Sequence, residues 1–228
     1  MTDSAFDIRD NFDIRDNIII VTGGDISPVF LDRQLKENEN SYVIGVDKGL
    51  DTLHALHVRP NLVIGDFDSV DSGIRAIYAG SPDAIVLNPE KDYTDTHVAV
   101  LEALKRKPAG IKLVGATGTR LDHVMGNLAL LKLCLLQGVE AVIVDEHNRI
   151  RMIDRQLRIR KDSQYGKYVS CIPFSDRVEG LTISGFQYNL EDATIIKEET
   201  IGISNELREE EGFITLKKGY LLVMETKD

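Results

Sequence analysis

Three groups of acidic residues each follow a short apolar run in the first half of the chain. They lie in Val63-Ile64-Gly65-Asp66-Phe67-Asp68-Ser69, Lys91-Asp92-Tyr93-Thr94-Asp95 and Gly118-Thr119-Arg120-Leu121-Asp122-His123. In an open parallel α/β sheet the carboxyl ends of the strands share one edge, so loops that are distant in sequence meet in one crevice. Carboxylates gathered beside Lys91 and Arg120 are typical of a site for a divalent metal and a polyphosphate.

The Asp66-Phe67-Asp68 segment is the first candidate for the metal site. If the chain is extended there, both carboxylates point to one side and Phe67 points into the core. Two carboxylates so close repel each other unless a cation lies between them, and Mg²⁺ binds one or two carboxylates together with phosphate oxygens. The alternative is an Asp-rich turn that caps the following helix.

Lys91, Asp92, Thr94 and Asp95 lie at the next junction between a strand and a helix. A helix amino terminus offers free N–H groups to an anion. Lys91 is placed to hold a phosphate there, while Asp92 or Asp95 completes the metal shell or orients an attacking hydroxyl group. The same residues also fit an ordinary capping box with Thr94 or Asp95 as the cap, and both interpretations can hold together.

Glycines accompany the third acidic group. Gly115 and Gly118 let the backbone approach a ligand closely, and Arg120 is a natural partner of a phosphate or a carboxylate. His123 is more often a hydrogen-bonding residue at a helix start than a catalytic group. Thr22-Gly23-Gly24-Asp25 forms a similar permissive turn, and the chain contains no G-x-x-x-x-G-K-[ST] sequence.

Alternation of short β-rich runs with amphipathic segments indicates βαβ units and a parallel sheet in the first part of the chain. Strands are expected at 18–22, 42–46, 62–64, 84–87, 111–114 and 141–144. Helices are expected at 29–38, 50–57, 72–79, 94–105 and 121–137. Residues 18–146 are therefore expected to form an α/β domain.

The remaining residues show a different pattern. Short apolar runs are separated by Gly, Asn, Asp and Pro, which is typical of an antiparallel β-sandwich or a small barrel. These strands are expected at 149–153, 157–160, 168–172, 181–183, 194–197, 213–217 and 221–224. We expect residues 147–228 to form an all-β sandwich domain. Residues 1–17, which contain the hexapeptide FDIRDN twice in succession, are expected to be a flexible leader.

Composition favours a protein with a real core and a small charged ligand. Of the 228 residues 43% are hydrophobic, and 27 basic against 37 acidic residues give a formal net charge of -10. An acidic surface disfavours binding to nucleic acid and to anionic membranes. Cys134 and Cys171 are expected in the core of a reduced, cytoplasmic protein. No run approaches the roughly 18 apolar residues of a membrane span, and the acidic amino terminus does not resemble a signal peptide.

Five ordered motifs resemble those of the thiamine pyrophosphokinase family, and the resemblance spans roughly Ile18 to Met224. They are Val46-Asp47 with Gly49, the segment from Pro60 to Ser69, Lys91 to Asp95, Gly115 to Asn127, and Gly202 to Glu206. The resemblance implies transfer of the pyrophosphoryl group of ATP to the hydroxyl of thiamine, giving thiamine diphosphate and AMP. It also implies a nucleotide-binding α/β domain followed by a β-sandwich, Mg²⁺, and a homodimer with thiamine sites between the subunits.

Together, the loops and this resemblance give one set of expected site residues. The catalytic residues are Asp66, Asp68, Asp92 and Asp95, of which Asp66, Asp68 and Asp95 bind the metal. The residues for ATP and its phosphates are Gly24, Asp47, Lys48, Lys91, Thr94, Gly118, Arg120, Asp122 and His123. The residues for thiamine are Ser204 and Asn205.

The chain departs from the family pattern in three places, and three other functions compete. Ala116 stands where a second glycine is usual, Lys48 interrupts the usual Asp-Gly-Gly, and Val223 stands where eukaryotic members carry a tryptophan that packs on thiamine. The competing functions are a diphosphokinase with a hydroxymethyl pterin acceptor, a non-catalytic sensor of nucleotide or thiamine diphosphate, and a metal phosphohydrolase. The segment from Gly202 to Glu206 favours thiamine, and four retained aspartates disfavour a mere sensor.

Overall fold

The computed structural model describes residues 17–68, 70–78, 80–88 and 92–228. The expected leader therefore lies outside the described residues except for Asn17, which is buried. Lys91, an expected phosphate ligand, also lies outside them.

Strands and helices alternate through the first part of the chain. The strands are β1 (Asn17–Val21), β2 (Tyr42–Val46), β3 (Leu62–Gly65), β4 (Ala84–Val86), β5 (Gly110–Val114) and β6 (Glu140–Val144). The helices are α1 (Pro28–Lys36), α2 (Gly49–Ala55), α3 (Ser72–Tyr78), α4 (Asp95–Lys105) and α5 (Leu121–Leu136). These strands pair in parallel in the order β6-β5-β1-β2-β3-β4. The order reverses between β1 and β5, which creates the kind of switch point where open α/β sheets bind ligands.

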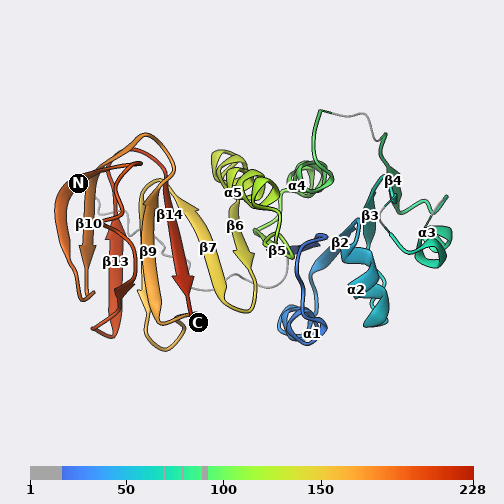
Figure 1. The fold of residues 1–228 in the computed structure, drawn as a ribbon, viewed down its shortest axis with the longest axis horizontal. Coiled ribbons are helices and arrows are strands. Elements are labelled where there is room, and N and C mark those ends of the chain that lie inside the picture. The colour runs from blue at the N-terminus through green and yellow to red at the C-terminus, as the bar shows by residue number, and fades with distance from the viewer. Residues whose placement is uncertain (1–16, 69, 79, 89–91) are drawn as a thin grey trace, which may run out of the picture.

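Helices cover both faces of this parallel sheet (Figure 1). Along β1, Ile18 and Ile20 pack in the core beneath α4 and α5, whereas Ile19 and Val21 pack in the core with α1 and α2. All four side chains are buried. A strand buried on both faces needs apolar residues at every position, which explains its continuous apolar run.

The strands of the second part follow one another without an intervening helix. They are β7 (Asn148–Ile153), β8 (Gln156–Arg160), β9 (Tyr168–Pro173), β10 (Arg177–Ser184), β11 (Leu190–Ile196), β12 (Asn205–Glu206), β13 (Glu211–Thr215) and β14 (Leu221–Thr226). β10, β11, β13 and β8 form a four-stranded antiparallel sheet that packs over the core around Val178, Leu181, Ile214 and Leu221. The expected fold class, an α/β part followed by an antiparallel β-sandwich, is confirmed.

One sheet runs through both parts of the molecule. β6 pairs antiparallel with β7, and β14, β9 and β12 follow, so that the sheet has ten strands in the order β12-β9-β14-β7-β6-β5-β1-β2-β3-β4. The expected domain boundary at 146/147 falls in the turn between β6 and β7. The sandwich therefore shares one of its two sheets with the α/β part, a connection that the strand pattern alone did not indicate.

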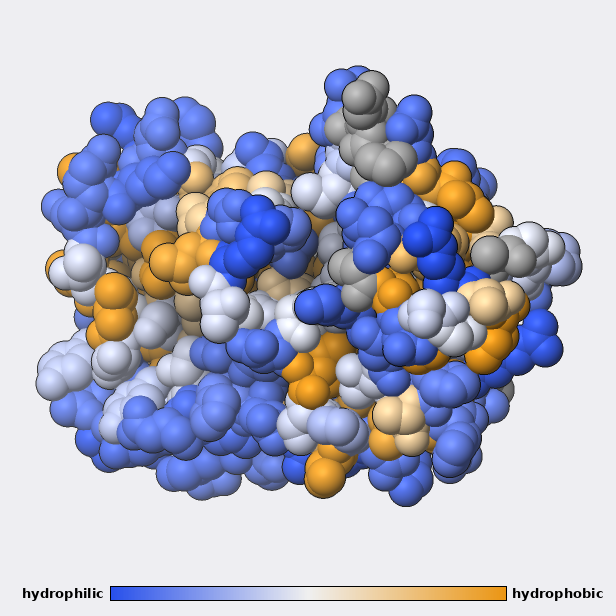
Figure 2. Space-filling model, turned by 45° about the vertical axis from the view of Figure 1, so that its right-hand side comes forward, coloured by the Kyte–Doolittle hydropathy of each residue, from blue (hydrophilic) through white to orange (hydrophobic). Residues whose placement is uncertain are grey.

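Apolar side chains form separate patches on a mostly hydrophilic surface (Figure 2). Leu121 and Met125 are exposed on α5, and Tyr188, Ile201 and Ile203 are exposed on the β-sandwich. Both cysteines are buried and unpaired, as expected. No helix among the described residues has the length and apolar character needed to cross a membrane.

Candidate active site

Asp47 and Lys48, the first residues after β2, lie between the turns that follow β1 and β3. A Cβ atom added to Gly65 would overlap the carboxylate of Asp47, and one added to Gly23 would lie 3.1 Å from Cβ of Lys48. Because Gly23 and Gly65 have no side chain, they leave room for the loop after β2, which carries Asp47 and Lys48. Asp47 itself has a φ of 44°, in the left-handed region that is uncommon for residues other than glycine.

The turns after β1 and β5 are hydrogen-bonded to each other. The Gly24 N–H donates to the Gly115 carbonyl at 2.8 Å, and the Asp25 N–H donates to the Thr117 carbonyl at 3.1 Å. A Cβ atom on Gly24 would overlap the carbonyl oxygens of both Thr117 and Gly115. Gly24 is therefore required for this close approach of two backbone segments.

Gly24→Ala is expected to lower the free energy of unfolding by about 1–3 kcal/mol, because the backbone must move to admit the methyl group. Gly126→Ala is the matched control, since a Cβ there meets no atom within 4 Å and the residue lies inside α5. The control should raise stability by about 0.4–1 kcal/mol. Urea denaturation measures both, and equal stability of the two variants would contradict the packing of Gly24.

Asp66, Phe67 and Asp68 form a tight turn. β3 ends at Gly65, and Phe67 has a φ of 58°, so the backbone is not extended here and the condition under which both carboxylates point to one side is not met. The Asp68 N–H donates to Oδ1 of Asp66 at 3.1 Å. Phe67 is 2% exposed, which confirms that its ring packs in the core. Bulky residues held in the left-handed region cost free energy and concentrate at functional sites.

The amino terminus of α4 holds the second acidic group. Oγ1 of Thr94 caps the helix by accepting a hydrogen bond from the His97 N–H at 3.2 Å. Asp92 is exposed and Asp95 is half-buried in the first turn. The rings of Tyr93 and His97, which are absent from the expected set, lie 4.3 Å apart. Burial lowers the pKa of His97, so its imidazole is neutral at neutral pH.

The aspartates of the first two acidic groups suit a metal ion that is held jointly by the protein and by the phosphates of a substrate. No three acidic, imidazole or thiol side chains of the described residues gather into a complete metal cage. Mg²⁺ is ordinarily held by one or two carboxylates, water and substrate phosphates. The two aspartates of the turn after β3 provide that donor set, and Asp95 lies on a separate element.

Arg120 and Asp122 form an exposed ion pair where α5 begins. The guanidinium donates from Nη2 to Oδ2 of Asp122 at 2.7 Å and from Nε to Oδ1 at 3.3 Å. The hydrogen bond from Arg120 lowers the pKa of Asp122 to about 2, so this carboxylate stays ionised at neutral pH. His123 is exposed on the same turn.

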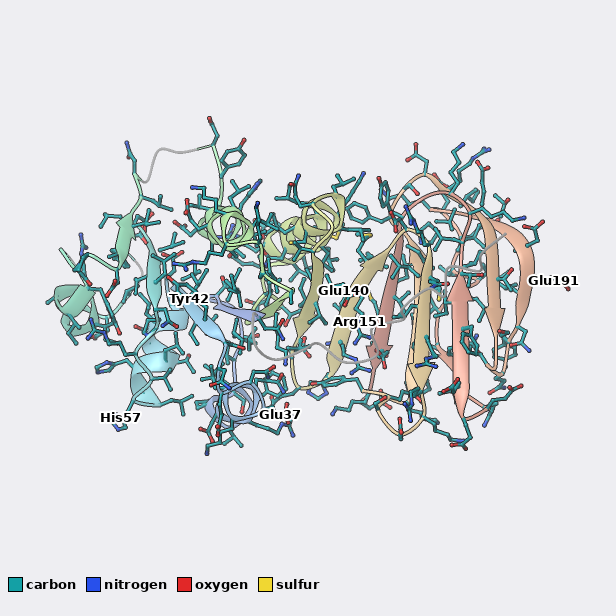
Figure 3. The ribbon with its side chains drawn as sticks, turned by 180° about the vertical axis from the view of Figure 1, so that it is seen from behind. Glu37, Tyr42, His57, Glu140, Arg151 and Glu191 are labelled. Atoms are coloured by element: carbon teal, nitrogen blue, oxygen red, sulfur yellow. The ribbon has the colours of Figure 1, made fainter. Side chains whose placement is uncertain are left out.

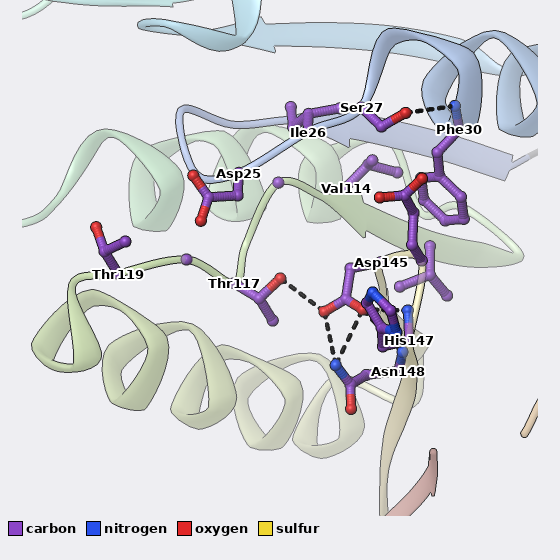
Figure 4. Close-up of a pocket in the computed structure, with 14 residues that line it drawn as sticks. Asp25, Ile26, Ser27, Phe30, Val114, Thr117, Thr119, Asp145, His147 and Asn148 are labelled. Atoms are coloured by element: carbon purple, nitrogen blue, oxygen red, sulfur yellow. Dashed lines mark hydrogen bonds between the residues drawn. The ribbon is translucent and has the colours of Figure 1, made fainter. Parts of the chain in front are cut away.

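A pocket of about 560 Å³ lies at the switch point of the sheet (Figure 4). The loops after β1, β5 and β6 line it, and Gly118 is the member of the expected set found among its described lining residues. Asp145 organises one wall: it accepts hydrogen bonds from Oγ1 of Thr117 at 2.7 Å and from the N–H groups of His147 and Asn148, both at 2.8 Å. This wall presents polar groups to a cavity large enough for a nucleoside.

Asp145, His147 and Asn148 are absent from the expected set of site residues. Their signal is the same as that of the acidic groups, namely polar residues directly after an apolar strand, here β6. The change of sequence pattern at this place predicts a domain boundary and gives no separate sign of a ligand-binding loop. Because β6 lies next to β5 in the sheet, its loop also reaches the carboxyl edge.

Ser204 and Asn205 lie at the other end of the ten-stranded sheet, where β12 begins. Asn205 is 8% exposed, and its amide accepts from the Tyr188 N–H at 3.0 Å and donates to the Tyr188 carbonyl at 2.7 Å. This gives Asn205 a structural role. The turn presents the exposed Ser204, at a φ of 59°, and the Tyr188 side chain, which is 65% exposed.

Comparison with known proteins finds a matching family model for each of the two parts of the chain. A family model described as thiamin pyrophosphokinase, catalytic domain, matches residues 34–143, and one described as thiamin pyrophosphokinase, vitamin B1 binding domain, matches residues 154–221. The chain belongs to the thiamine pyrophosphokinase family. In this thiamine pyrophosphokinase family member the two matched regions are separated by residues 144–153, which comprise the last residue of β6, the β6–β7 connection and the whole of β7.

Other members of the thiamine pyrophosphokinase family are similar in sequence and in structure. Thiamine pyrophosphokinase of Bacillus subtilis (strain 168) is 36% identical over 193 residues, which cover 84% of this chain and 90% of that protein. A crystal structure of the Bacillus subtilis protein gives a TM-score of 0.82 at 35% identity, covering 93% of this chain and 99% of that one. Yeast thiamin pyrophosphokinase, at 15% identity and a TM-score of 0.77 over 96% of this chain and 88% of that one, shares the fold.

Proposed function

We propose that this chain transfers the pyrophosphoryl group of Mg-ATP to the hydroxyl group of thiamine, giving thiamine diphosphate and AMP. The observation that carries the proposal is the meeting of the loops after β1, β2, β3 and β5 at one sheet edge. Family membership supplies the acceptor, since the acidic loops by themselves suit any polyphosphate.

ATP binds at the carboxyl edge of the parallel strands. Its nucleoside occupies the pocket between the loops after β1, β5 and β6, and its phosphates lie toward Gly24, Lys48 and Arg120. Asp66 and Asp68 would hold Mg²⁺, which would supply positive charge against the negative charge that develops on the transferred group. Asp95 or Asp92 accepts the proton of the attacking hydroxyl, a role that requires a carboxylate within hydrogen-bonding distance of it.

Distance within one chain favours a site shared between two copies. Eight strand-to-strand steps separate β12, which carries Asn205, from β3, which precedes Asp66. At about 4.8 Å for each step the separation is roughly 38 Å, several times the length of thiamine. A homodimer in which one copy supplies Ser204 and the other supplies the acidic loops resolves this, and the exposed apolar residues of α5 and the sandwich provide surface for it.

Tyr188 takes the stacking role of the missing tryptophan, because Asn205 fixes its backbone beside Ser204 and its ring is exposed. Tyr188→Ala is expected to raise KM for thiamine about tenfold, from the loss of about 1–1.5 kcal/mol of aromatic contact. Tyr188→Phe keeps the ring and should keep KM within about twofold. Steady-state kinetics at saturating ATP measures both, and an unchanged KM in Tyr188→Ala would refute the stacking role.

Complementation tests the shared site. Asp68→Asn and Tyr188→Ala chains are denatured together, refolded in equal amounts and assayed at low thiamine. Random mixing makes half of the dimers mixed, each with one intact site, so about one quarter of wild-type activity should return. Activity equal to the mean of the two unmixed variants would contradict a shared site.

Removal of Mg²⁺ with EDTA should abolish turnover, and added Mg²⁺ should restore it.

The cytoplasm is the proposed location, with thiamine and ATP as partners and neither nucleic acid nor membrane. The formal charge of -10 and the two unpaired buried cysteines support this. Fractionation of cells that express a tagged chain tests the location.

A further inference from the structure

Two buried hydroxyl groups join the turn after β1 to the first turn of α4. Oγ1 of Thr22 and Oγ1 of Thr96 lie 2.7 Å apart, and the two residues are 6% and 7% exposed. Thr22 directly precedes Gly23 and Gly24, and Thr96 directly follows Asp95. The hydrogen bond therefore connects a glycine turn and an acidic helix start that are 74 residues apart in sequence.

A second buried hydrogen bond joins the turn after β5 to a helix. Nδ2 of Asn127, in α5, donates to the Ala116 carbonyl at 2.8 Å, and Asn127 is 7% exposed. The Thr22 N–H in turn donates to the Val114 carbonyl at 2.9 Å. The two turns and the two helices are therefore one hydrogen-bonded unit beneath the exposed loops.

Stability alone does not require a hydroxyl pair at this place. Valine has nearly the shape of threonine, and replacing both partners of a buried hydrogen bond with apolar groups of the same shape is nearly neutral. Unlike a valine pair, the hydrogen-bonded hydroxyl pair fixes the orientation and the separation of the turn after β1 and the first turn of α4. Because Thr96 and Asp95 are adjacent in the first turn of α4, fixing Thr96 also fixes Asp95.

We propose that Thr22 and Thr96 are positioning residues, whose hydrogen bond sets the Asp95 carboxylate against the Gly23-Gly24 turn. The inference rests on the proposed pyrophosphoryl transfer. In-line transfer depends on placement, and a displacement of about 1 Å can reduce the rate about a hundredfold. In the proposed homodimer the thiamine contacts of each site come from the other copy and not from these turns and helices, so KM for thiamine should not respond.

The test combines a double Thr22→Val, Thr96→Val variant with the single Thr22→Ser and Thr96→Ser variants. Thr182→Val is the control, because its hydroxyl accepts from the Asp192 N–H at 3.1 Å in β10, far from the acidic loops. For each variant kcat, KM for ATP, KM for thiamine and the unfolding temperature are measured. The double variant should keep its unfolding temperature and lose about 10- to 100-fold in kcat, with KM for thiamine changed less than about twofold.

Rescue by serine separates positioning from packing. Both serine variants retain the hydroxyl, so their kcat should stay within about threefold of wild type although they lose a methyl group. A kcat of the double valine variant within about twofold of wild type would overturn the inference. If that variant does not fold, Thr96→Ala is compared with Thr96→Ser at a temperature where both are folded, and equal kcat values overturn it. An inactive wild-type protein would instead overturn the proposed function, and the inference with it.

Discussion

Asp68→Asn is expected to reduce thiamine diphosphate formation about a thousandfold or more. Asp68 lies in the tight turn after β3, and its backbone N–H, which asparagine retains, bonds to Asp66. The substitution therefore removes charge and leaves the turn intact. Loss of a metal carboxylate removes several kcal/mol of transition-state stabilisation, and each 1.4 kcal/mol corresponds to a tenfold change in rate.

Asp71→Asn is the matched control for this experiment. Asp71 is an exposed aspartate of the same loop, and its Oδ1 accepts from the Gly73 N–H at 2.8 Å, a capping role that asparagine can fill. Its kcat should stay within about twofold of wild type. Equal activity of the Asp68 and Asp71 variants, measured at saturating substrates and with unchanged circular dichroism, would remove Asp68 from the metal site.

Glu225→Ala is expected to lower the free energy of unfolding by about 3 kcal/mol. Glu225 is fully buried in β14 and accepts hydrogen bonds from Nε of Arg149 at 2.7 Å, Nη1 of Arg151 at 2.8 Å and the Tyr165 N–H at 3.1 Å. Arg151 is drawn near Glu140 of the neighbouring strand β6 (Figure 3). Removing the central carboxylate leaves the two largely buried guanidinium groups on β7 without their shared anionic partner. Removing one partner of a buried ion pair costs about 3–5 kcal/mol.

Glu179→Ala is the control for this stability measurement. The Glu179 carboxylate lies 3.5 Å from Nζ of Lys218, and both side chains are substantially exposed. Its removal should change the free energy of unfolding by less than about 1 kcal/mol. Urea denaturation of the two variants gives the comparison. A Glu225 variant no less stable than the Glu179 variant would show that the buried triad does not support the junction between β7 and β14.

Features with a local cause could be predicted from the sequence. The run Ile18-Ile19-Ile20-Val21 indicates a strand buried on both faces wherever its neighbours lie, and β2 follows the expected bounds 42–46. Thr94 caps α4 as its position predicts. The placement of Asp47 and Asp66 at the same sheet edge follows from the geometry of parallel strands.

Features with a tertiary cause could not be predicted in this way. Antiparallel pairing of β6 with β7 extends the sheet into the sandwich, and only long-range pairing decides this. The left-handed φ of Phe67 depends on the core that holds its ring. Asn205 was expected to meet thiamine, a role that stays a prediction, whereas its bonds to Tyr188 depend on a contact across 17 residues. Val223 is 1% exposed in the sandwich core, so this position offers no aromatic surface to a ligand.

Product analysis with the wild-type protein decides whether pyrophosphoryl transfer to thiamine takes place. The protein is incubated with Mg-ATP, with and without thiamine, and AMP, ADP and thiamine diphosphate are quantified. We predict equal amounts of AMP and thiamine diphosphate, formed only when thiamine is present, and no ADP. Formation of AMP that does not depend on thiamine, or of ADP in place of AMP, would contradict the proposed reaction.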